Sequence, residues 1–151
     1  MKDLDKALNF AFLLLKYRAR SINEMKSRLK AKGYSSALRD KVIVYLLDYN
    51  YLNDKDFAES YVNSALDKGW GPRKIDYKLK TLGIAQDLRS STLENIDCSS
   101  RLKEIVLNKL KSLKKRNPDI SKKLLFEKTA RFLAAKGFNY QDIYLSLKDV
   151  L

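Results

Sequence analysis

The 151-residue chain contains no histidine and only one cysteine, Cys98. A lone cysteine cannot form an intramolecular disulfide, so we expect a structural thiol in a reducing, cytoplasmic compartment. Without histidine, zinc and haem sites have almost no ligands, and no Ser–His triad can form. No glycine-rich phosphate loop is present, and no residue pair singles out a Ser–Lys nucleophile. We therefore expect a protein without cofactor, metal or catalytic activity.

Turn-forming residues are also scarce, with five glycines and two prolines. A sheet-rich protein of this size needs more of them, so a few long helices are favoured. The longest apolar run, from Ala7 to Leu15, is interrupted by Asn9 and is too short to cross a bilayer. Hydrophobic residues nevertheless make up 45% of the chain, enough to form a core. These features predict a helical protein with no membrane segment.

Positive charge is in large excess. Thirty-one Lys and Arg residues face eighteen Asp and Glu residues, which gives a formal net charge of +13. Such an excess repels itself within a folded chain and attracts polyanions. The charge predicts a nucleic acid or an acidic protein surface as partner.

Three segments end in the same way, with Leu-x-x-x-Gly and an apolar residue, at Gly33, Gly83 and Gly137. The apolar positions upstream of the first two glycines also correspond, with Ala7, Leu8, Ala11, Phe12 and Leu15 parallel to Phe57, Ala58, Tyr61, Val62 and Ala65. This spacing defines one face of a helix. The pattern predicts an all-α fold of three tandem three-helix repeats at 1–50, 51–97 and 98–151. Because each repeat is too small to close its own core, we expect an elongated, curved helical stack.

Helix boundaries follow from capping signals. Ser21 with Glu24 predicts a capping box, and Asn53 and Asn139 are expected to be N-caps. Pro72 and Pro118 are each predicted to occupy a first helical position. Asp54 and Asp56 form a close carboxylate pair at a helix start, for which capping is favoured over metal binding. The nine predicted helices cover residues 4–17, 22–32, 36–49, 54–68, 72–82, 86–96, 101–116, 119–136 and 140–150.

Basic side chains recur on successive repeats, which favours a continuous contact surface over unrelated solvated positions. Arg18, Arg20, Arg73 and Lys74 are selected because no packing requirement is evident for them. Trp70 lies in a Gly-Trp-Gly-Pro turn, where partner contact and packing between helices are equally favoured. The candidate partner or DNA contacts are Arg18, Arg20, Lys26, Arg28, Lys30, Trp70, Arg73, Lys74, Lys115, Arg116 and Arg131.

Most other aromatic residues are predicted to be packed. The helical stripes assign this role to Tyr17, Tyr61, Phe126 and Phe132. A second group, Tyr45, Tyr49 and Tyr51, is expected to seal the junction with the second repeat.

Two stretches resemble the signatures of the RecX family of recombinase regulators. The first is Arg18-x-Arg20-Ser21-x-x-Glu24-Met25-x-x-x-Leu29-x-x-x-Gly33-Tyr34. The second runs from Leu52-Asn53-Asp54 to Gly83-Ile84 and includes Phe57, Ala58, Tyr61, Gly69, Gly71 and Pro72. Many of these residues cap or terminate helices, as does Gly137 in the third repeat. The resemblance extends over residues 18–84.

The resemblance implies a regulatory, non-enzymatic protein of DNA repair, recombination and the SOS response. It implies binding to the RecA filament, to its single- or double-stranded DNA, and inhibition of ATP hydrolysis and strand exchange. We expect a monomer. A basic helical nucleic-acid-binding module without a recombinase partner is the alternative.

Overall fold

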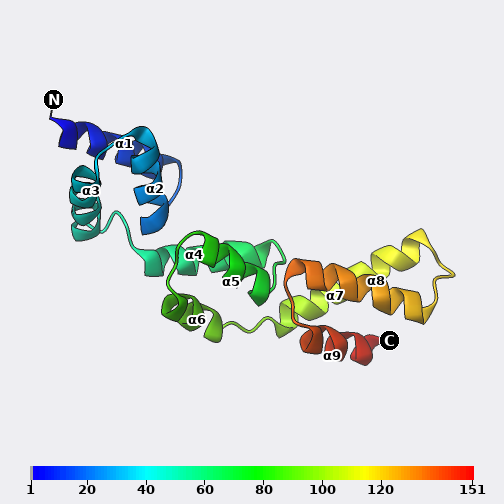
Figure 1. The fold of residues 1–151 in the computed structure, drawn as a ribbon. Helices are drawn as coiled ribbons and strands as arrows, with labels where there is room; N and C mark the ends of the chain where they lie inside the picture. Colours follow the sequence, from blue (N-terminus) through cyan, green and yellow to red (C-terminus); the bar gives the residue numbers. More distant parts are fainter. Residues whose placement is uncertain (1) are drawn as a thin grey trace. The chain divides into compact units, whose positions relative to one another are not determined.

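The computed structural model of the chain describes residues 2–151, and the fold of this part is entirely helical (Figure 1). Its helices are α1 (Asp3–Tyr17), α2 (Ile22–Lys32), α3 (Ser36–Asp48), α4 (Asp54–Asp67), α5 (Pro72–Thr81), α6 (Gln86–Glu94), α7 (Ser99–Arg116), α8 (Lys122–Lys136) and α9 (Tyr140–Val150). No strand occurs in this range. The all-α fold of tandem three-helix repeats predicted from the sequence is confirmed.

The helices form two compact units. The first unit comprises the chain up to Tyr61 together with Leu79–Thr92, and the second comprises Val62–Lys78 together with Leu93–Leu151. The boundaries fall within α4 and α5, so one end of each of these helices belongs to the first unit and the other end to the second.

The core of the first unit lies among α1, α2 and α3. Ala7 and Ala11 of α1 are fully buried, as are Met25 and Leu29 of α2. Both pairs have i,i+4 spacing, which places their side chains on one helix face. From α3, Val42, Ile43 and Leu46 complete this cluster.

Aromatic packing in this unit agrees with expectation only in part. Tyr51 and Tyr45 place their rings 4.9 and 6.4 Å from that of Phe12 on α1, so Tyr51, at the start of the second predicted repeat, packs on the first. The Tyr49 ring is tilted against that of Tyr45 at 4.5 Å, and Tyr49 is 65% exposed. Among the three tyrosines predicted to seal the junction between these repeats, Tyr51 makes a ring contact across it, whereas Tyr45 and Tyr49 make ring contacts within the first repeat. Tyr17, predicted to be packed, is 83% exposed because it ends α1 beyond the core.

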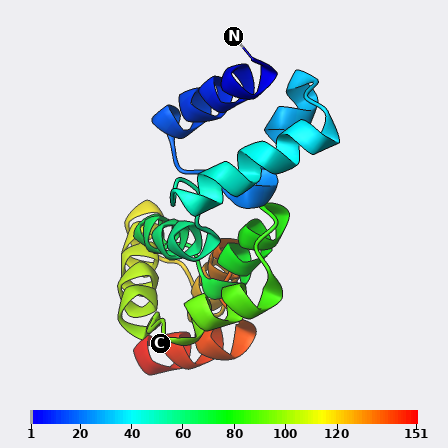
Figure 2. The same cartoon turned by 90° about the vertical axis from the view of Figure 1, so that its left-hand side faces the viewer.

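The core of the second unit lies among α7, α8 and α9, which lie side by side (Figure 1 and Figure 2). It consists of leucines and other apolar side chains at helical spacing: Leu102, Val106, Leu110, Leu113, Leu125, Leu133, Phe138, Ile143 and Leu147. Phe126 and Phe132 are half-buried against this cluster, in agreement with their predicted packing.

Most predicted caps are present. The Ser21 hydroxyl accepts a hydrogen bond from the Glu24 amide, and the Glu24 carboxylate accepts one from the Ser21 amide. The Asn53 and Asn139 side chains cap α4 and α9. The prediction for Pro118 is wrong. Because the Ser121 hydroxyl accepts the Leu124 amide, α8 begins at Lys122, and Pro118 lies in the preceding turn.

Each unit contains a similar junction, in which the start of one helix donates a hydrogen bond to a carbonyl at the end of another. In the first unit, the Ser21 hydroxyl donates to the Leu82 carbonyl at 2.6 Å, just before Gly83. In the second, the Gly71 amide donates to the Lys136 carbonyl at 2.7 Å, just before Gly137. Both helix-ending glycines have positive φ. Gly83 and Gly137 therefore end helices at points where the start of another helix docks, whereas an added Cβ at Gly33 would meet nothing.

Asp54 strengthens the first of these junctions. Its Oδ1 accepts the Ile22 amide at 2.9 Å, so a residue at the start of α4 satisfies a free amide at the start of α2. Asp54 was predicted to cap its own helix. Its observed role is to join α4 to α2.

Gly83→Ala tests the junction, with Gly33→Ala as matched control. Both glycines have positive φ, but an added Cβ collides with Asn23 at position 83 and meets open space at position 33. Backbone strain alone costs about 1–2 kcal/mol, and the collision adds about 1–3 kcal/mol. We expect thermal unfolding to show the larger loss for Gly83→Ala. Equal losses would show that the junction does not contribute to stability.

Phe57→Ala tests the packing of α4. Phe57 is 8% exposed, and its ring stacks on Tyr61 at 6.0 Å. Truncation of a buried aromatic side chain costs about 3–5 kcal/mol. Denaturant unfolding should show this loss, whereas Tyr17→Ala should change stability little. An unchanged midpoint for Phe57→Ala would contradict the assignment.

Candidate partner-binding surface

The candidate contacts divide between the two units. Arg18, Arg20, Lys26, Arg28 and Lys30 lie in the first unit, near or on α2. The second unit contains Trp70, Arg73, Lys74, Lys115, Arg116 and Arg131.

Arg18 has a structural partner that the sequence did not reveal. Its guanidinium donates to both carboxylate oxygens of Glu24, with Nη1 at 3.2 Å from Oε1. Although burial raises the pKa of the Glu24 carboxyl, the hydrogen bonds from Arg18 and from the Ser21 amide lower it overall. Arg18 therefore holds the capping-box glutamate. Arg18 thus has a structural role, contrary to the prediction that no packing requirement explains it.

Arg20 is buried rather than displayed on the surface. The residue is 8% exposed, and its Nε is buried without a hydrogen-bond acceptor among the described residues. Burial, followed by repulsion from Arg18, lowers its pKa. A buried guanidinium without a paired carboxylate is energetically unfavourable. Attraction to Glu24 offsets part of this cost, and the Arg20 Nε remains a buried donor without an acceptor among the described residues.

The exposed part of this group lies on α2. Lys26, Arg28 and Lys30 are all exposed, whereas Met25 and Leu29 are buried. Lys26 and Lys30 lie on one side of this buried stripe and Arg28 on the other, so basic residues flank the core-facing side of the helix. Arg28 also lies close enough to Arg20 to repel its charge.

Trp70 combines packing with exposure. The ring lies 4.3 Å from Lys74 Nζ and 5.3 Å from Lys68 Nζ, within the range of cation–π attraction. Its turn is fixed because the neighbouring Gly71 amide bonds to Lys136. Lys74 packs at Gly137, so this predicted contact residue also has a structural role. Arg73 bonds to the Gly137 carbonyl through its amide and remains exposed.

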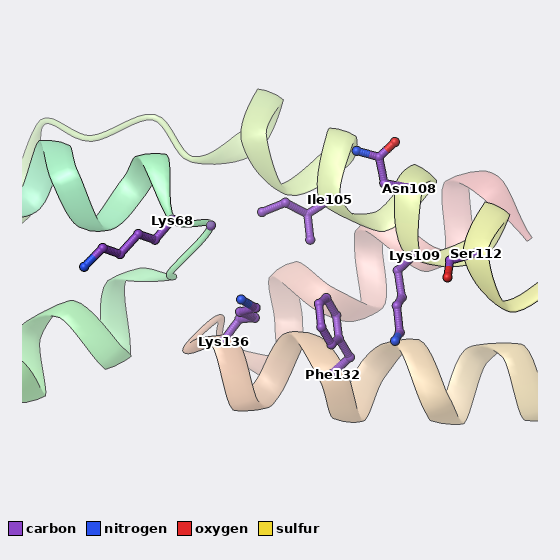
Figure 3. Close-up of a pocket in the computed structure, with 8 residues that line it drawn as sticks. Lys68, Ile105, Asn108, Lys109, Ser112, Phe132 and Lys136 are labelled. Carbon is purple, nitrogen blue, oxygen red and sulfur yellow. The ribbon is translucent and has the colours of Figure 1, made fainter.

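Phe132 is the most informative residue that the sequence analysis did not select as a candidate contact. It lines a hollow of about 330 Å³ in which Lys109 Nζ lies 4.4 Å and Lys136 Nζ 5.6 Å from the ring centroid (Figure 3). On its other side a hollow of about 400 Å³ is lined by Lys109, Lys128, Arg131 and Phe132. The i,i+4 spacing of Phe132 and Lys136 was the one signal available in the sequence.

The remaining candidates lie outside these hollows. Lys115 and Arg116 are exposed in the last turn of α7.

Cys98 is half-buried at the N-cap of α7, and burial raises the pKa of its thiol. Within residues 2–151, no group of three or more potential metal ligands is found. In the same range, every helix is too short or too polar to cross a membrane.

Comparison with known proteins places two segments in one family of models. Residues 7–46 match the model described as RecX, first three-helix domain, and residues 53–93 match RecX, second three-helix domain. The regulatory protein RecX of Bacillus velezensis is 35% identical over 147 residues, which are 97% of this chain and 56% of that protein. That of Clostridium botulinum is 33% identical over 131 residues, covering 85% of this chain and 60% of that protein. The chain thus spans less than two thirds of the length of these relatives.

The fold has a counterpart among solved structures. The crystal structure of RecX from Lactobacillus salivarius matches with a TM-score of 0.86 at 26% identity, covering 97% of this chain and 96% of that chain. A second structure, of regulatory protein RecX, matches with a TM-score of 0.80 at 21% identity. The latter shows similarity of fold alone.

Glu24→Gln tests the Arg18 contact through pH. The pKa of Glu24 is lowered in the folded state, so its stabilisation is present above the unfolded pKa of about 4.3 and is lost as pH falls through the folded pKa. Glutamine preserves the capping box but removes the ion pair. We expect the wild type to be more stable at pH 7 by about 1 kcal/mol. The difference should shrink below about pH 4 in thermal unfolding.

The exposed Glu104→Gln variant is the control, and it should follow the wild type at every pH. A difference between wild type and Glu24→Gln that stays constant from pH 7 to pH 3 would contradict the role of the Arg18–Glu24 pair.

Proposed function

Because the chain belongs to the RecX family of regulatory proteins, we propose that it binds the RecA recombinase filament and inhibits its ATP hydrolysis and strand exchange. The observation that carries this proposal is the agreement with RecX proteins through both three-helix domains, residues 7–46 and 53–93. This regulatory role on recombinase and DNA would be exercised by a cytoplasmic monomer without a cofactor.

Charge and burial support this proposal. A RecA filament presents acidic protein groups and DNA phosphates together, and both attract a chain with a net charge of +13. On α2 the exposed Lys26, Arg28 and Lys30 lie beside Arg20, whose buried guanidinium has an unpartnered Nε. An acidic group of the partner would offset the unfavourable burial of Arg20. The structure therefore favours α2 and the segment before it as the contact of the first unit.

A basic nucleic-acid-binding module without a recombinase partner is the second candidate function. One observation favours it specifically. The cationic, aromatic hollows at Phe132 lie between α7 and α8, and apart from Lys68 and Gly69 their lining residues lie outside the segments that match the two RecX domain models.

Lys26→Glu with Lys30→Glu tests the recombinase proposal better than reversal of Arg18 and Arg20. Arg18 holds Glu24 and Arg20 is buried, so changing them would disturb the fold. The measurement is the DNA-dependent ATPase rate of RecA against titrated protein, at two DNA concentrations. We expect wild-type inhibition well below one copy per RecA monomer, and about tenfold weaker inhibition by the variant, equivalent to about 1.4 kcal/mol.

Lys6→Glu with Lys55→Glu is the matched control. It changes the net charge equally, at exposed positions in the first turns of α1 and α4, where acidic residues are tolerated. It should inhibit like the wild type. Inhibition that is relieved by excess DNA, with the α2 variant indistinguishable from wild type, would instead favour the plain nucleic-acid-binding function.

A further inference from the structure

The hollow beside Phe132 is built by residues that converge from three segments of the second unit. Ile105, Asn108 and Lys109 come from α7, Phe132 and Lys136 from α8, and Lys68 from the end of α4 (Figure 3). Lys68 and the glycine that follows it close the hollow where α4 ends. We call this the Phe132 hollow, defined by these six residues.

Its surface is an aromatic and aliphatic floor surrounded by cations. The Phe132 ring lies between α7 and α8, while Lys109 and Lys136 place their ammonium groups 4.4 and 5.6 Å from its centroid (Figure 3). The neighbouring hollow shares Phe132 and Lys109 and adds Lys128 and Arg131. The lining of the two hollows contains five cationic residues and no carboxylate.

We propose that the Phe132 hollow binds one unpaired base of a single-stranded nucleic acid, stacked on the Phe132 ring, while the surrounding lysines contact the flanking phosphates. The inference deepens the DNA-binding part of the proposed function and rests on it. It adds a base-contact subsite whose lining, apart from Lys68 and Gly69, lies outside the matched domain segments, and it restricts the ligand to unpaired strands.

Size and chemistry favour a base over other occupants. The volume of about 330 Å³ lies within the range of small-ligand pockets and admits a planar ring. A base presents a π-face to Phe132. The phosphates on either side of the base can pair with the five cationic residues, which have no carboxylate partner in the lining. A protein aromatic side chain would satisfy the ring but not the cations. A base within a duplex cannot reach the ring, because its faces are already stacked.

The lysines next to the Phe132 ring can make way for a base. Each carries its ammonium group on a flexible side chain, so the ammonium can move from the ring face to a phosphate when a base binds. Asn108 and Ser112 are the neutral polar residues of the lining. Amide and hydroxyl groups donate and accept hydrogen bonds, so they do not select one base strongly. The subsite should therefore tolerate different bases.

The test compares two ligands of equal length and charge, oligo(dT) and an abasic oligonucleotide, by fluorescence anisotropy with the full chain. Wild type should bind oligo(dT) more tightly. Phe132→Leu preserves apolar packing but removes the ring, and should weaken oligo(dT) binding by about 5- to 150-fold, the range for one base–aromatic stack. Its affinity for the abasic strand should not change.

Two variants control for packing and aromaticity. Phe126→Leu alters another half-buried α8 phenylalanine, which packs against Tyr144 and lines neither hollow. It should retain the preference for bases, and Phe132→Tyr should retain it too. Lys109→Gln with Lys136→Gln should reduce the salt slope by about 1.4, for two phosphate contacts on a single strand, with both ligands.

A second measurement covers the case in which Phe132→Leu fails to fold. The double variant Trp70→Phe, Phe132→Trp contains one tryptophan, since the chain has only one. Its fluorescence should be quenched by oligo(dT) and not by the abasic strand. Equal quenching by both ligands would overturn the inference.

An unchanged base preference in folded Phe132→Leu would also overturn it. These readouts contain no recombinase, so they are independent of RecA inhibition. If Phe132→Leu loses the base preference, but the wild-type chain has no effect on the RecA ATPase, only the recombinase proposal would be rejected. Normal RecA inhibition by a chain that binds both oligonucleotides equally would reject only the Phe132 subsite.

Discussion

The repeated architecture depends on one kind of contact, in which the start of one helix donates a hydrogen bond to a backbone carbonyl at the end of another. The Leu82 and Lys136 carbonyls are helix-end acceptors that lack a full set of partners within their own helices. Ser21 and Gly71 supply the missing donors. Because Gly83 and Gly137 carry no side chain, Asn23 and Lys74 can approach these helix ends closely. The repeat of sequence is therefore a repeat of junctions, and a change at one junction affects two helices.

A junction that uses backbone carbonyls and few side chains leaves the surrounding side chains available for other roles. On α2, Met25 and Leu29 face the core, while the basic residues on either side of them are exposed to solvent. The chain can therefore hold a net charge of +13 without placing these cations in its cores. The exception is Arg20, which is buried with its Nε unpartnered among the described residues, so an anion from a partner would stabilise it. Charge excess and burial thus favour binding of the same kind of partner.

Local signals predicted the helices well, because stripes, caps and glycines act within a few residues of one another. Ser21 was identified as an N-cap, but its second hydrogen bond, to Leu82, joins residues far apart in the chain. Asp54 was likewise predicted to cap its own helix and instead caps α2. The Phe132 hollow requires α4, α7 and α8 together, so no local pattern contained it. Tertiary contacts, rather than helix formation, set the limit of prediction from this sequence.

The third repeat shows how a longer helix changes the use of this junction. Ser21 and Gly71 each lie twelve residues before the glycine that ends their helix. The corresponding position before Gly137 is Leu125, which lies inside α8 and is buried in the core. Since an internal helical amide is already bonded, Leu125 cannot donate as Gly71 does. The extra turn of α8 therefore removes the docking element from this repeat. The contact between α7 and α8 is left free of that constraint, and it is there that the cationic hollows with Phe132 occur.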